Sequence, residues 1–193
     1  VQIGHSATSQ LNHIEVLDSL RKFADEDIKI FMPLNYGDKA YGDKVQAYAE
    51  EIFHEKVMCL REMLPVEEYF DLIGRVDIAI FNTQRQIGLG NINRILFRNV
   101  KTYTPSDSIM YKYFVSEGVP IQKSDDIANM DFAEFTSEKR TENKEAFERF
   151  IKGKTDMNTQ LNYWKDIYND LRKRAKAENK VNINEGEYRF KGL

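Results

Sequence analysis

The sequence predicts an α/β fold in which helices cover both faces of a parallel β-sheet. Short apolar segments alternate along the chain with stretches whose apolar residues recur at helical spacing. The strongest of the short segments, VDIAIF at residues 76–81, has the β-branched, nearly continuous apolar character of a strand buried on both faces. Strands that alternate with helices of about 10–15 residues form βαβ units, so the expected sheet is Rossmann-like.

Six apolar segments are expected to form the strands. NYGD has the composition of a turn and follows the second of them. Connections between consecutive parallel strands are right-handed, which brings the intervening helices back onto the sheet. The expected strands are residues 1–3, 28–34, 56–60, 76–81, 100–104 and 119–122.

Five helices are expected between these strands. Apolar spacing places three of them at residues 11–23, 41–53 and 91–97. Pro65 suits the first turn of another helix, whose apolar residues run to Ile73. The remaining helix is expected to have Ser106 or Asp107 as its N-cap and to end at Gly118.

The alternation of strands and helices stops after residue 125. Residues 127–135 are ambiguous, and the tail at 187–193 has no clear assignment. Two helices are expected at 141–153 and 159–176, the second with one apolar face formed by Leu161, Trp164, Tyr168 and Leu171. We therefore expect a Rossmann-like domain at residues 1–127 and a helical extension at residues 128–193 that packs on the same domain.

Composition excludes several classes of protein. The chain has 193 residues, of which 41% are hydrophobic and 31% charged, as in an ordinary soluble domain. A net charge of −3 gives no basic field for nucleic acid. The single cysteine, Cys59, excludes an internal disulfide and a multi-cysteine zinc site. There is no apolar run of the roughly 20 residues that a membrane span needs, and no signal peptide, so a cytoplasmic location is expected.

Two loops at the carboxyl edge of the expected sheet are rich in small residues. GHSATSQLNH at residues 4–13 follows the first strand and leads into a helix, whose first N–H groups suit an anion. TQRQIGLGN at 83–91 follows the most buried strand and adds Arg85, whose planar fork suits phosphate oxygens. Two such loops favour a diphosphate site. A capped helix start and a surface loop whose arginine pairs with a carboxylate are the alternatives.

Other candidate residues have simpler alternative explanations. His5 and His13 flank the first loop and could act as a base or offset a leaving phosphate, although a lone histidine is more often a hydrogen-bonding surface residue. The segment at 60–73 is placed to meet a nucleobase, or is only a helix with acidic residues in its first turn. The run RKRAK at 172–176 could contact anionic lipid, or is only a solvated helix end.

The order and spacing of four blocks resemble a known family over about residues 2–127. The blocks GHSAT…NH, MPLNYG, PVEEYFDLI and VDIAIFNTQRQIGLGNI are similar to those of the 4-alpha-L-fucosyltransferases, glycosyltransferase family 56. The resemblance implies the GT-B architecture, in which two Rossmann-like domains face across a cleft and the C-terminal one holds the nucleotide sugar. It also implies transfer of 4-acetamido-4,6-dideoxygalactose (Fuc4NAc) from a dTDP-sugar to a lipid-linked saccharide, as in enterobacterial common antigen assembly, with no cofactor and no metal.

Site residues carried over from the resemblance fall into three groups. Arg85 and His13 are the expected catalytic residues. The donor diphosphate is expected to contact Ser6, Ala7, Thr8, Asn12, Arg85, Gln86, Gly88, Gly90 and Asn91. The base and ribose are expected to contact Glu62, Met63, Leu64, Asn93 and Arg94.

The sequence departs from the family pattern in two ways. His5 stands where the family form of the first loop has Asn. The chain also opens without Met, directly in a strand-like run, so we expect a missing N-terminal domain as a partner. A catalytic base in that domain would leave this fragment able to bind donor without transferring sugar. A lipid-linked acceptor further implies peripheral contact with the inner face of the cell membrane.

Two other kinds of function compete with the glycosyltransferase. A non-catalytic nucleotide-binding module would use the same loops without preferring thymidine or uridine nucleotides. An interaction domain with no small ligand would have the edge of its sheet blocked by side chains. A nicotinamide or methyl-donor enzyme is disfavoured because the glycine fingerprint is absent and Pro33, Leu34 and Asn35 occupy the end of the second strand.

Overall fold

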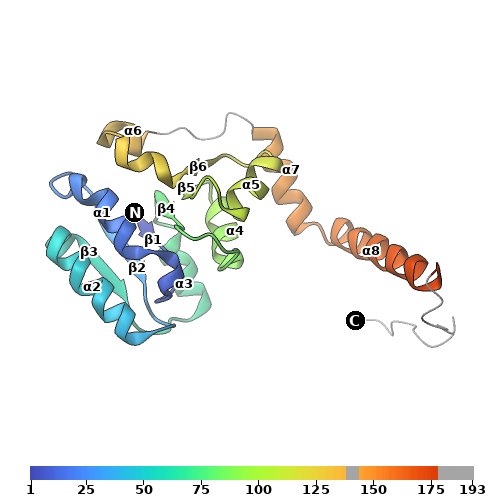
Figure 1. The fold of residues 1–193 in the computed structure, drawn as a ribbon, viewed down its shortest axis with the longest axis horizontal. Helices are drawn as coiled ribbons and strands as arrows, with labels where there is room; N and C mark the ends of the chain where they lie inside the picture. Colours follow the sequence, from blue (N-terminus) through green and yellow to red (C-terminus); the bar gives the residue numbers. More distant parts are fainter. Residues whose placement is uncertain (138–143, 178–193) are drawn as a thin grey trace. The chain divides into compact units, whose positions relative to one another are not determined.

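A six-stranded, wholly parallel sheet forms the centre of the protein, in strand order β3-β2-β1-β4-β5-β6 (Figure 1). The computed structural model describes residues 1–137 and 144–177. All six expected strands form, each somewhat shorter than the apolar segment that predicts it. They are β1 Gln2–Ile3, β2 Ile30–Pro33, β3 Val57–Leu60, β4 Ile78–Ile80, β5 Lys101–Thr104 and β6 Ile121–Lys123.

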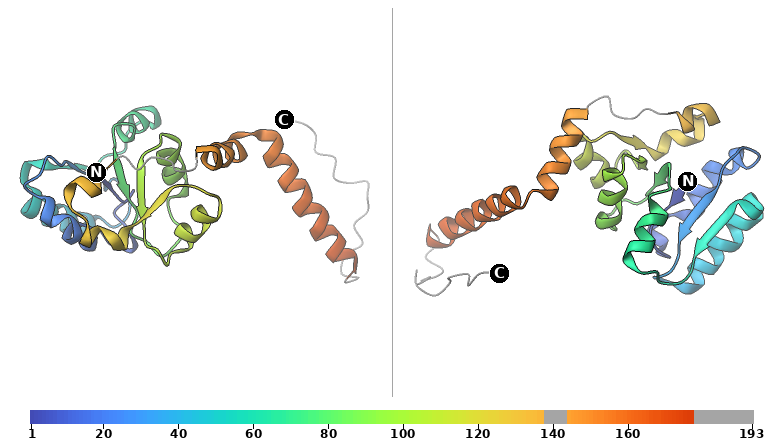
Figure 2. Two further views of the ribbon diagram at one scale, coloured as in Figure 1. Left: turned by 90° about the horizontal axis from the view of Figure 1, so that it is seen from above. Right: turned by 180° about the vertical axis from the view of Figure 1, so that it is seen from behind.

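Helices cover both faces of this sheet (Figure 2), which confirms the predicted fold class. On one face, alternate strand residues such as Ile30 and Ile80 join a core with the apolar sides of α1 (His13–Leu20) and α2 (Lys39–Phe53). The opposite face is covered by α3 (Val66–Ile73) and α4 (Leu89–Phe97), which bury Ile73 and Ile92. Every residue of β4 is buried, as the continuous apolar run predicts.

The helices α2 and α4 each begin two residues before the predicted start, and two other helix starts differ for identifiable reasons. Asn12 has a left-handed backbone and follows a 3₁₀ turn, η1 (Ser9–Leu11), so α1 begins at His13 rather than at residue 11. The helix α5 (Ile109–Ser116) has Ser108 as its N-cap, so the prediction of Ser106 or Asp107 is wrong. Ser108 is buried and its Oγ accepts a hydrogen bond from the N–H of Tyr111, whereas the N–H of Ser106 is bound by Asp125.

Short 3₁₀ turns and three further α-helices complete the described chain. The ambiguous segment 127–135 forms part of η4 (Ser124–Asn129) and α6 (Phe132–Thr136), whose Ile127 and Phe135 join the core. The helices α7 (Lys144–Thr155) and α8 (Met157–Ala177) follow. The other 3₁₀ turns are η2 (Arg21–Phe23) and η3 (His54–Lys56). The tail at 187–193 lies outside the described residues.

The chain divides into two compact units, Val1–Glu148 and Arg149–Leu193. The first contains the sheet together with η4 and α6, so the helical cover of the sheet extends past the predicted boundary at residue 127. Packing of the remaining extension on the same domain stays a prediction. No helix in the described ranges has both the length and the apolar composition to cross a bilayer.

The strand order reverses between β1 and β4. Gln2 of β1 pairs on one side with Phe31 and on the other with Ala79. The chain leaves β1 toward α1 and leaves β4 toward α4, and these two helices lie on opposite faces of the sheet. In open α/β sheets the carboxyl edge at such a point holds a crevice between the two diverging loops.

Candidate functional site

The loop after β1 is held against the loop after β2 by backbone hydrogen bonds. The N–H of Ala7 donates to the carbonyl of Tyr36 at 2.7 Å, and the N–H of Asp38 donates to the carbonyl of Ala7 at 2.8 Å. Gly37 sits at the closest approach with a φ of +107°, and a Cβ there would lie 2.5 Å from the carbonyl oxygen of Ala7. Glycine is therefore required for the two loops to pair.

Most of the first loop is folded inward. Ser6 and Ala7 are buried, and the hydroxyls of Ser6 and Thr8 lie 2.8 Å apart in a hydrogen bond. Thr8 is half-buried, whereas Ser9 and Gln10 are exposed. Ser6 and Ala7 can therefore support the surface of the loop, and Thr8 is the predicted residue of this trio that is in contact with solvent.

Asn12 joins three loops at the carboxyl edge. Its Nδ2 donates to the carbonyl of Asn82, in the loop after β4, at 2.9 Å. The side chain of Asn82 donates to Glu15 and accepts a hydrogen bond from Ser124, which follows β6. Asn12 therefore has a structural role that fixes the first loop relative to the second.

His13 is fully buried at the start of α1. Its Nδ1 lies 3.3 Å from the hydroxyl of Tyr41, and its Nε2 has no hydrogen-bond partner in the described structure. Burial, with a smaller contribution from His5, lowers the pKa of His13 to about 4. The imidazole is neutral at pH 7 and its side chain does not reach the surface.

The second loop meets the first at His5 and Gly88. Gly88 is the N-cap residue of α4 with a φ of +70°, and a Cβ on it would lie 2.5–2.6 Å from both ring nitrogens of His5. The ring of His5 fills the space directly between the two turns, and its burial lowers its pKa. The two small-residue loops are therefore neighbours, as the fold class predicts, and the absence of a side chain at residue 88 makes this contact possible.

Arg85 and Gln86 project from the second loop into solvent. Arg85 is anchored through its backbone, because its N–H donates to the hydroxyl of Thr83 at 3.2 Å and its carbonyl accepts from Ile87. Within the described residues its guanidinium makes no ion pair. The alternative in which Arg85 is paired with a neighbouring carboxylate is therefore not what the structure shows.

A cavity of about 410 Å³ opens beside His5 at the carboxyl edge of the sheet. Residues from the loops after β1, β2 and β3 line it together with α3 and α4. Six residues predicted for the site lie in this cavity, namely Met63, Leu64, Gly90, Asn91, Asn93 and Arg94. The other predicted residues, Ser6, Ala7, Thr8, Asn12, His13, Glu62, Arg85, Gln86 and Gly88, are not in its lining.

Four of the residues that line this cavity carry a buried polar atom that has no hydrogen-bond partner among the described residues. They are Nδ1 of His5, Oδ1 of Asn35, Oδ1 of Asn93 and Nε of Arg94. Buried polar atoms are nearly always hydrogen-bonded, and each one left without a partner is unfavourable by about 1–3 kcal/mol. Their concentration in one cavity gives it both donors and acceptors for a bound polar molecule.

This cavity lies where a doubly wound sheet binds nucleotides. A family model for the 4-alpha-L-fucosyltransferases, glycosyl transferase group 56, matches residues 1–152. The chain belongs to this family. The match confirms the resemblance and extends it through α6 into α7. The family is one of glycosyltransferases in glycan synthesis, whose reaction takes a sugar from a nucleotide-sugar donor to a saccharide acceptor.

Aromatic rings line one side of the cavity; they belong to the segment at 60–73 that was expected near the base, although neither ring was named as a site residue. Tyr69 and Phe70 come from α3, and the guanidinium of Arg94 lies 3.2 Å from the centre of the Phe70 ring. The hydroxyl of Tyr69 donates to Oδ1 of Asn91 at 2.7 Å, and burial raises the pKa of Tyr69 to about 12. This hydrogen bond leaves the two N–H groups of the Asn91 amide oriented for other partners.

A larger cavity in the glycosyltransferase opens at the opposite edge of the sheet. It has a volume of about 780 Å³ and is lined by the amino ends of strands and by α6. The ammonium of Lys101 there donates to the carbonyls of Glu134, Phe135 and Ser137, where it binds the last carbonyls of α6. The ammonium of Lys101 is therefore already hydrogen-bonded within the protein. Among the described residues this edge also lacks paired loops like those of the carboxyl side. The smaller cavity is therefore the better candidate site.

Proposed function

We propose that this family 56 chain binds a dTDP-sugar in the cavity beside His5 and serves the transfer of Fuc4NAc, or a related deoxy sugar, to a lipid-linked saccharide in bacterial surface polysaccharide synthesis. The setting proposed for this reaction is cytoplasmic, at the inner face of the membrane. The single observation that carries the proposal is the cavity of about 410 Å³, which places four unpartnered polar atoms among aromatic and apolar side chains. An interaction domain without a small ligand would close this edge with side chains instead.

The apolar part of the cavity suits a nucleobase and its ribose. Phe70 and Leu64 offer flat and apolar surface, while the amides of Asn35 and Asn93 can pair with the edge of a pyrimidine. Each amide provides both an acceptor and donors, as thymine needs for its N–H and its two carbonyl oxygens. Arg94 lies on the Phe70 ring and leaves its Nε available to a ribose or phosphate oxygen.

The diphosphate is proposed to lie between this cavity and the second loop, at the start of α4. The first N–H groups of a helix have no carbonyl partner within the helix and favour an anion. Arg85 projects from the same loop, and Thr8 is the part of the first loop that reaches solvent. When the acceptor hydroxyl bonds to the anomeric carbon, the bond from that carbon to the diphosphate breaks. Arg85 and the helix N–H groups then stabilise the charge on the departing oxygen.

We assign His13 a positioning role rather than direct contact with substrate. The neutral, fully buried imidazole lies next to Tyr41 and packs against the inner side of the first loop. Gly4 packs directly on it, since a Cβ at Gly4 would lie 2.6 Å from Nε2 of His13. Ser6 and Ala7 are assigned the same supporting role because they are buried in that loop.

Replacing Arg85 with Ala is expected to weaken dTDP binding by about tenfold, the usual effect of removing one charged hydrogen bond to an anion. Because the side chain is exposed and unpaired, the free energy of unfolding should change by less than about 0.5 kcal/mol. Isothermal titration calorimetry with dTDP, UDP and ADP measures the first effect and also the base preference. Gln84→Ala, which removes a hydrogen bond from the same exposed loop to Asp107 and no charge, is the control for loss of a contact that holds the loop. Equal affinity for dTDP in the Arg85→Ala variant and the parent chain would remove Arg85 from the site.

Replacing Asn93 with Leu is expected to separate stability from binding. Leucine has nearly the same shape and lacks the buried carbonyl oxygen, so the variant should be as stable as the parent or up to about 1 kcal/mol more stable. Its affinity for dTDP should fall by about tenfold, because the amide no longer meets the base or ribose. Urea denaturation and calorimetry test the two parts. Binding that is unaffected by the substitution would place the nucleotide elsewhere.

A further inference from the structure

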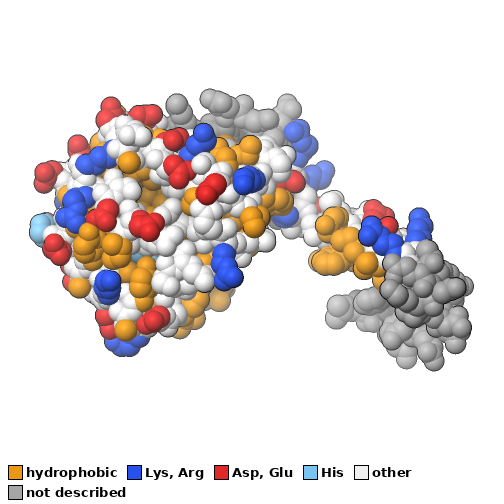
Figure 3. Space-filling model, in the orientation of Figure 1, with side chains coloured by type: hydrophobic (Ala, Val, Ile, Leu, Met, Phe, Trp, Pro, Cys, Tyr) orange, Lys and Arg blue, Asp and Glu red, His pale blue; other side chains and the backbone are white. Residues whose placement is uncertain are grey.

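The helix α8 carries an apolar stripe that is exposed to solvent. Leu161, Trp164, Tyr168 and Leu171 are the residues predicted to share one face, and in the structure Trp164 is 63% exposed and Leu171 59% exposed. Met157 continues the stripe at the start of the helix with 71% exposure. Figure 3 shows apolar side chains gathered on one side of the first part of α8. A stripe of this size, without a partner among the described residues, marks an interaction surface.

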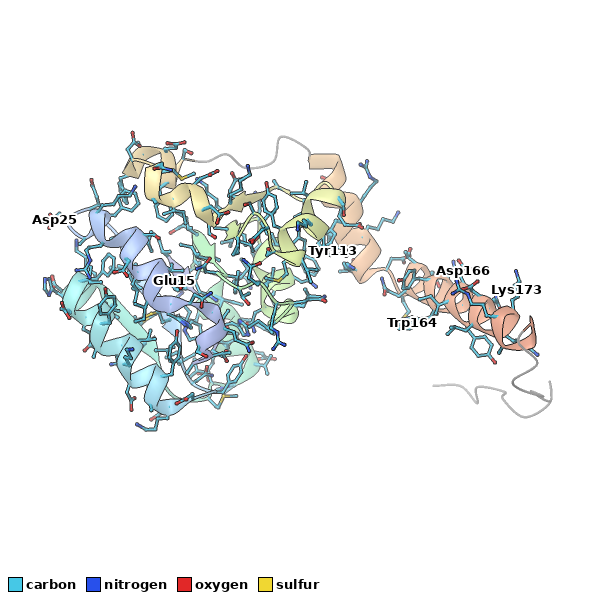
Figure 4. All side chains as sticks on the ribbon, in the orientation of Figure 1. Glu15, Asp25, Tyr113, Trp164, Asp166 and Lys173 are labelled. Atoms are coloured by element: carbon cyan, nitrogen blue, oxygen red, sulfur yellow. The ribbon has the colours of Figure 1, made fainter. Side chains whose placement is uncertain are left out.

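Cations border the stripe, and the two aspartates of the helix lie behind it together with Lys173. With 3.6 residues per turn, Lys165 and Arg172 flank one side of the stripe and Arg174 flanks the other. Arg174 also forms an exposed ion pair with Asp170 at 2.7 Å. Asp166 lies on the opposite face, and Figure 4 shows Trp164 and Asp166 pointing away from each other. The helix has five lysines and arginines against two aspartates, in a chain whose net charge is −3. The occupant of the stripe must therefore be apolar at its centre and anionic at its borders.

The pattern disfavours a second copy of the same helix. The apolar residues alternate in steps of four and three, the spacing of a coiled coil, but they cover fewer than three heptads, whereas coiled coils usually sustain at least three or four. The positions that border the seam in such a pair carry Lys165, Arg172 and Arg174 and no acid, so two copies would oppose like charges in either orientation.

We propose that α8 lies in the headgroup region of an anionic phospholipid bilayer, with its apolar stripe inserted and its flanking cations on the lipid phosphates. Trp164 and Tyr168 are the residue types that favour this interface, because each joins an apolar ring to a polar group. The hydrophobic stripe and its basic borders are those of a helix that binds parallel to the membrane surface rather than spanning it. The proposal rests on the membrane location in the proposed function and assigns α8 as the element that contacts the lipid. Binding of α8 to lipid does not require a nucleotide.

The test is vesicle binding by the full chain without nucleotide. Trp164 is the only tryptophan, so its fluorescence reports on this helix alone. With vesicles of phosphatidylcholine and 30% phosphatidylglycerol, a composition chosen to be anionic, we expect a blue shift of the emission and flotation with the lipid. Pure phosphatidylcholine should bind at least fivefold more weakly, and salt should weaken binding to the anionic vesicles.

Two matched double variants identify the surface. L161E/L171E places two acids in the stripe and should lower vesicle binding at least tenfold. N162E/N169E adds the same charge on the polar face and should lower it much less. Circular dichroism verifies that both variants keep their helices, and dTDP calorimetry shows that their first unit is intact.

Three results would overturn the proposal. The first is an unchanged Trp164 emission with anionic vesicles, and the second is an equal loss of binding in both double variants. The third is a concentration-dependent dimer, or a protein complex, that the L161E/L171E substitution abolishes while vesicles have no effect on the chain.

Discussion

Alanine at position 88 is expected to lower the free energy of unfolding by about 2–4 kcal/mol. The backbone at Gly88 has a φ of +70°, which is unfavourable by roughly 1–2 kcal/mol for a residue with a Cβ. That Cβ would also lie 2.5–2.6 Å from the ring nitrogens of His5, and the resulting overpacking adds about 1–3 kcal/mol. His5 is buried between two loops, so its ring can move aside only into the cavity that it lines. Urea denaturation at pH 7 measures the change.

Gly90 provides the matched control, two residues further on. It lies in the first turn of α4, and a Cβ added there has no atom within 4 Å. Gly90→Ala is therefore expected to leave stability unchanged or raise it by up to about 1 kcal/mol, the difference in helix propensity. If the two alanine variants unfold at the same urea concentration with the same slope, the contact between Gly88 and His5 is not as described.

The Gly88 substitution also tests the proposed diphosphate site. The displaced turn carries the first N–H groups of α4, so dTDP affinity should fall by at least tenfold in the fraction that remains folded. Gly90→Ala keeps this turn, so any loss of affinity there reports close approach of the ligand to Gly90 itself, which lines the cavity. A Gly88→Ala variant with parental affinity would remove the second loop from the proposed function.

Much of the fold could be predicted because its signals are local. The apolar run of β4 and the helical spacing in α2 are visible within single segments, and they yield the six strands and the principal helices. The alternation of these elements is enough to predict a parallel sheet with ligand loops at its carboxyl edge. The N-cap of α5 could not be chosen locally, because Ser106, Asp107 and Ser108 are all competent caps. The choice depends on Asp125, which binds the N–H of Ser106 from another loop.

The candidate site was less predictable because it is made of contacts between distant segments. The predicted residues Met63, Leu64, Asn93 and Arg94 line the cavity, whereas Phe70 is brought there by the packing of α3 against α4. Asn35 follows β2 directly, so its place at the carboxyl edge was the one signal that could have identified it. The alternative that His5 and His13 are hydrogen-bonding surface residues is wrong about their position. Both are buried, because the first loop folds over them.

His13 gives the glycosyltransferase a stability that depends on pH. Its pKa is lowered to about 4 in the folded chain, against about 6.5 for an unperturbed histidine. Between these values the unfolded chain binds more protons than the folded one, so stability falls as pH falls. The contribution is fully present above pH 6.5 and is lost progressively toward pH 4, by roughly 3 kcal/mol at most. Urea denaturation at pH 7 and pH 4.5 should show this loss.

Replacing His13 with Gln removes the titrating group and should flatten this dependence. The glutamine can still bond to Tyr41, but it does not refill the whole ring volume, so we expect the variant to be less stable at pH 7 and to lose about 2 kcal/mol less than the parent between pH 7 and 4.5. His54→Gln is the control, since His54 is exposed at the end of α2 and the same substitution there should preserve the parental difference. Should His13→Gln be too unstable to measure, the proton resonances of the parent imidazole provide the test. They should stay at their neutral positions down to about pH 5, and titration of His13 near pH 6.5 would show that the ring is in contact with water and free to act on a substrate.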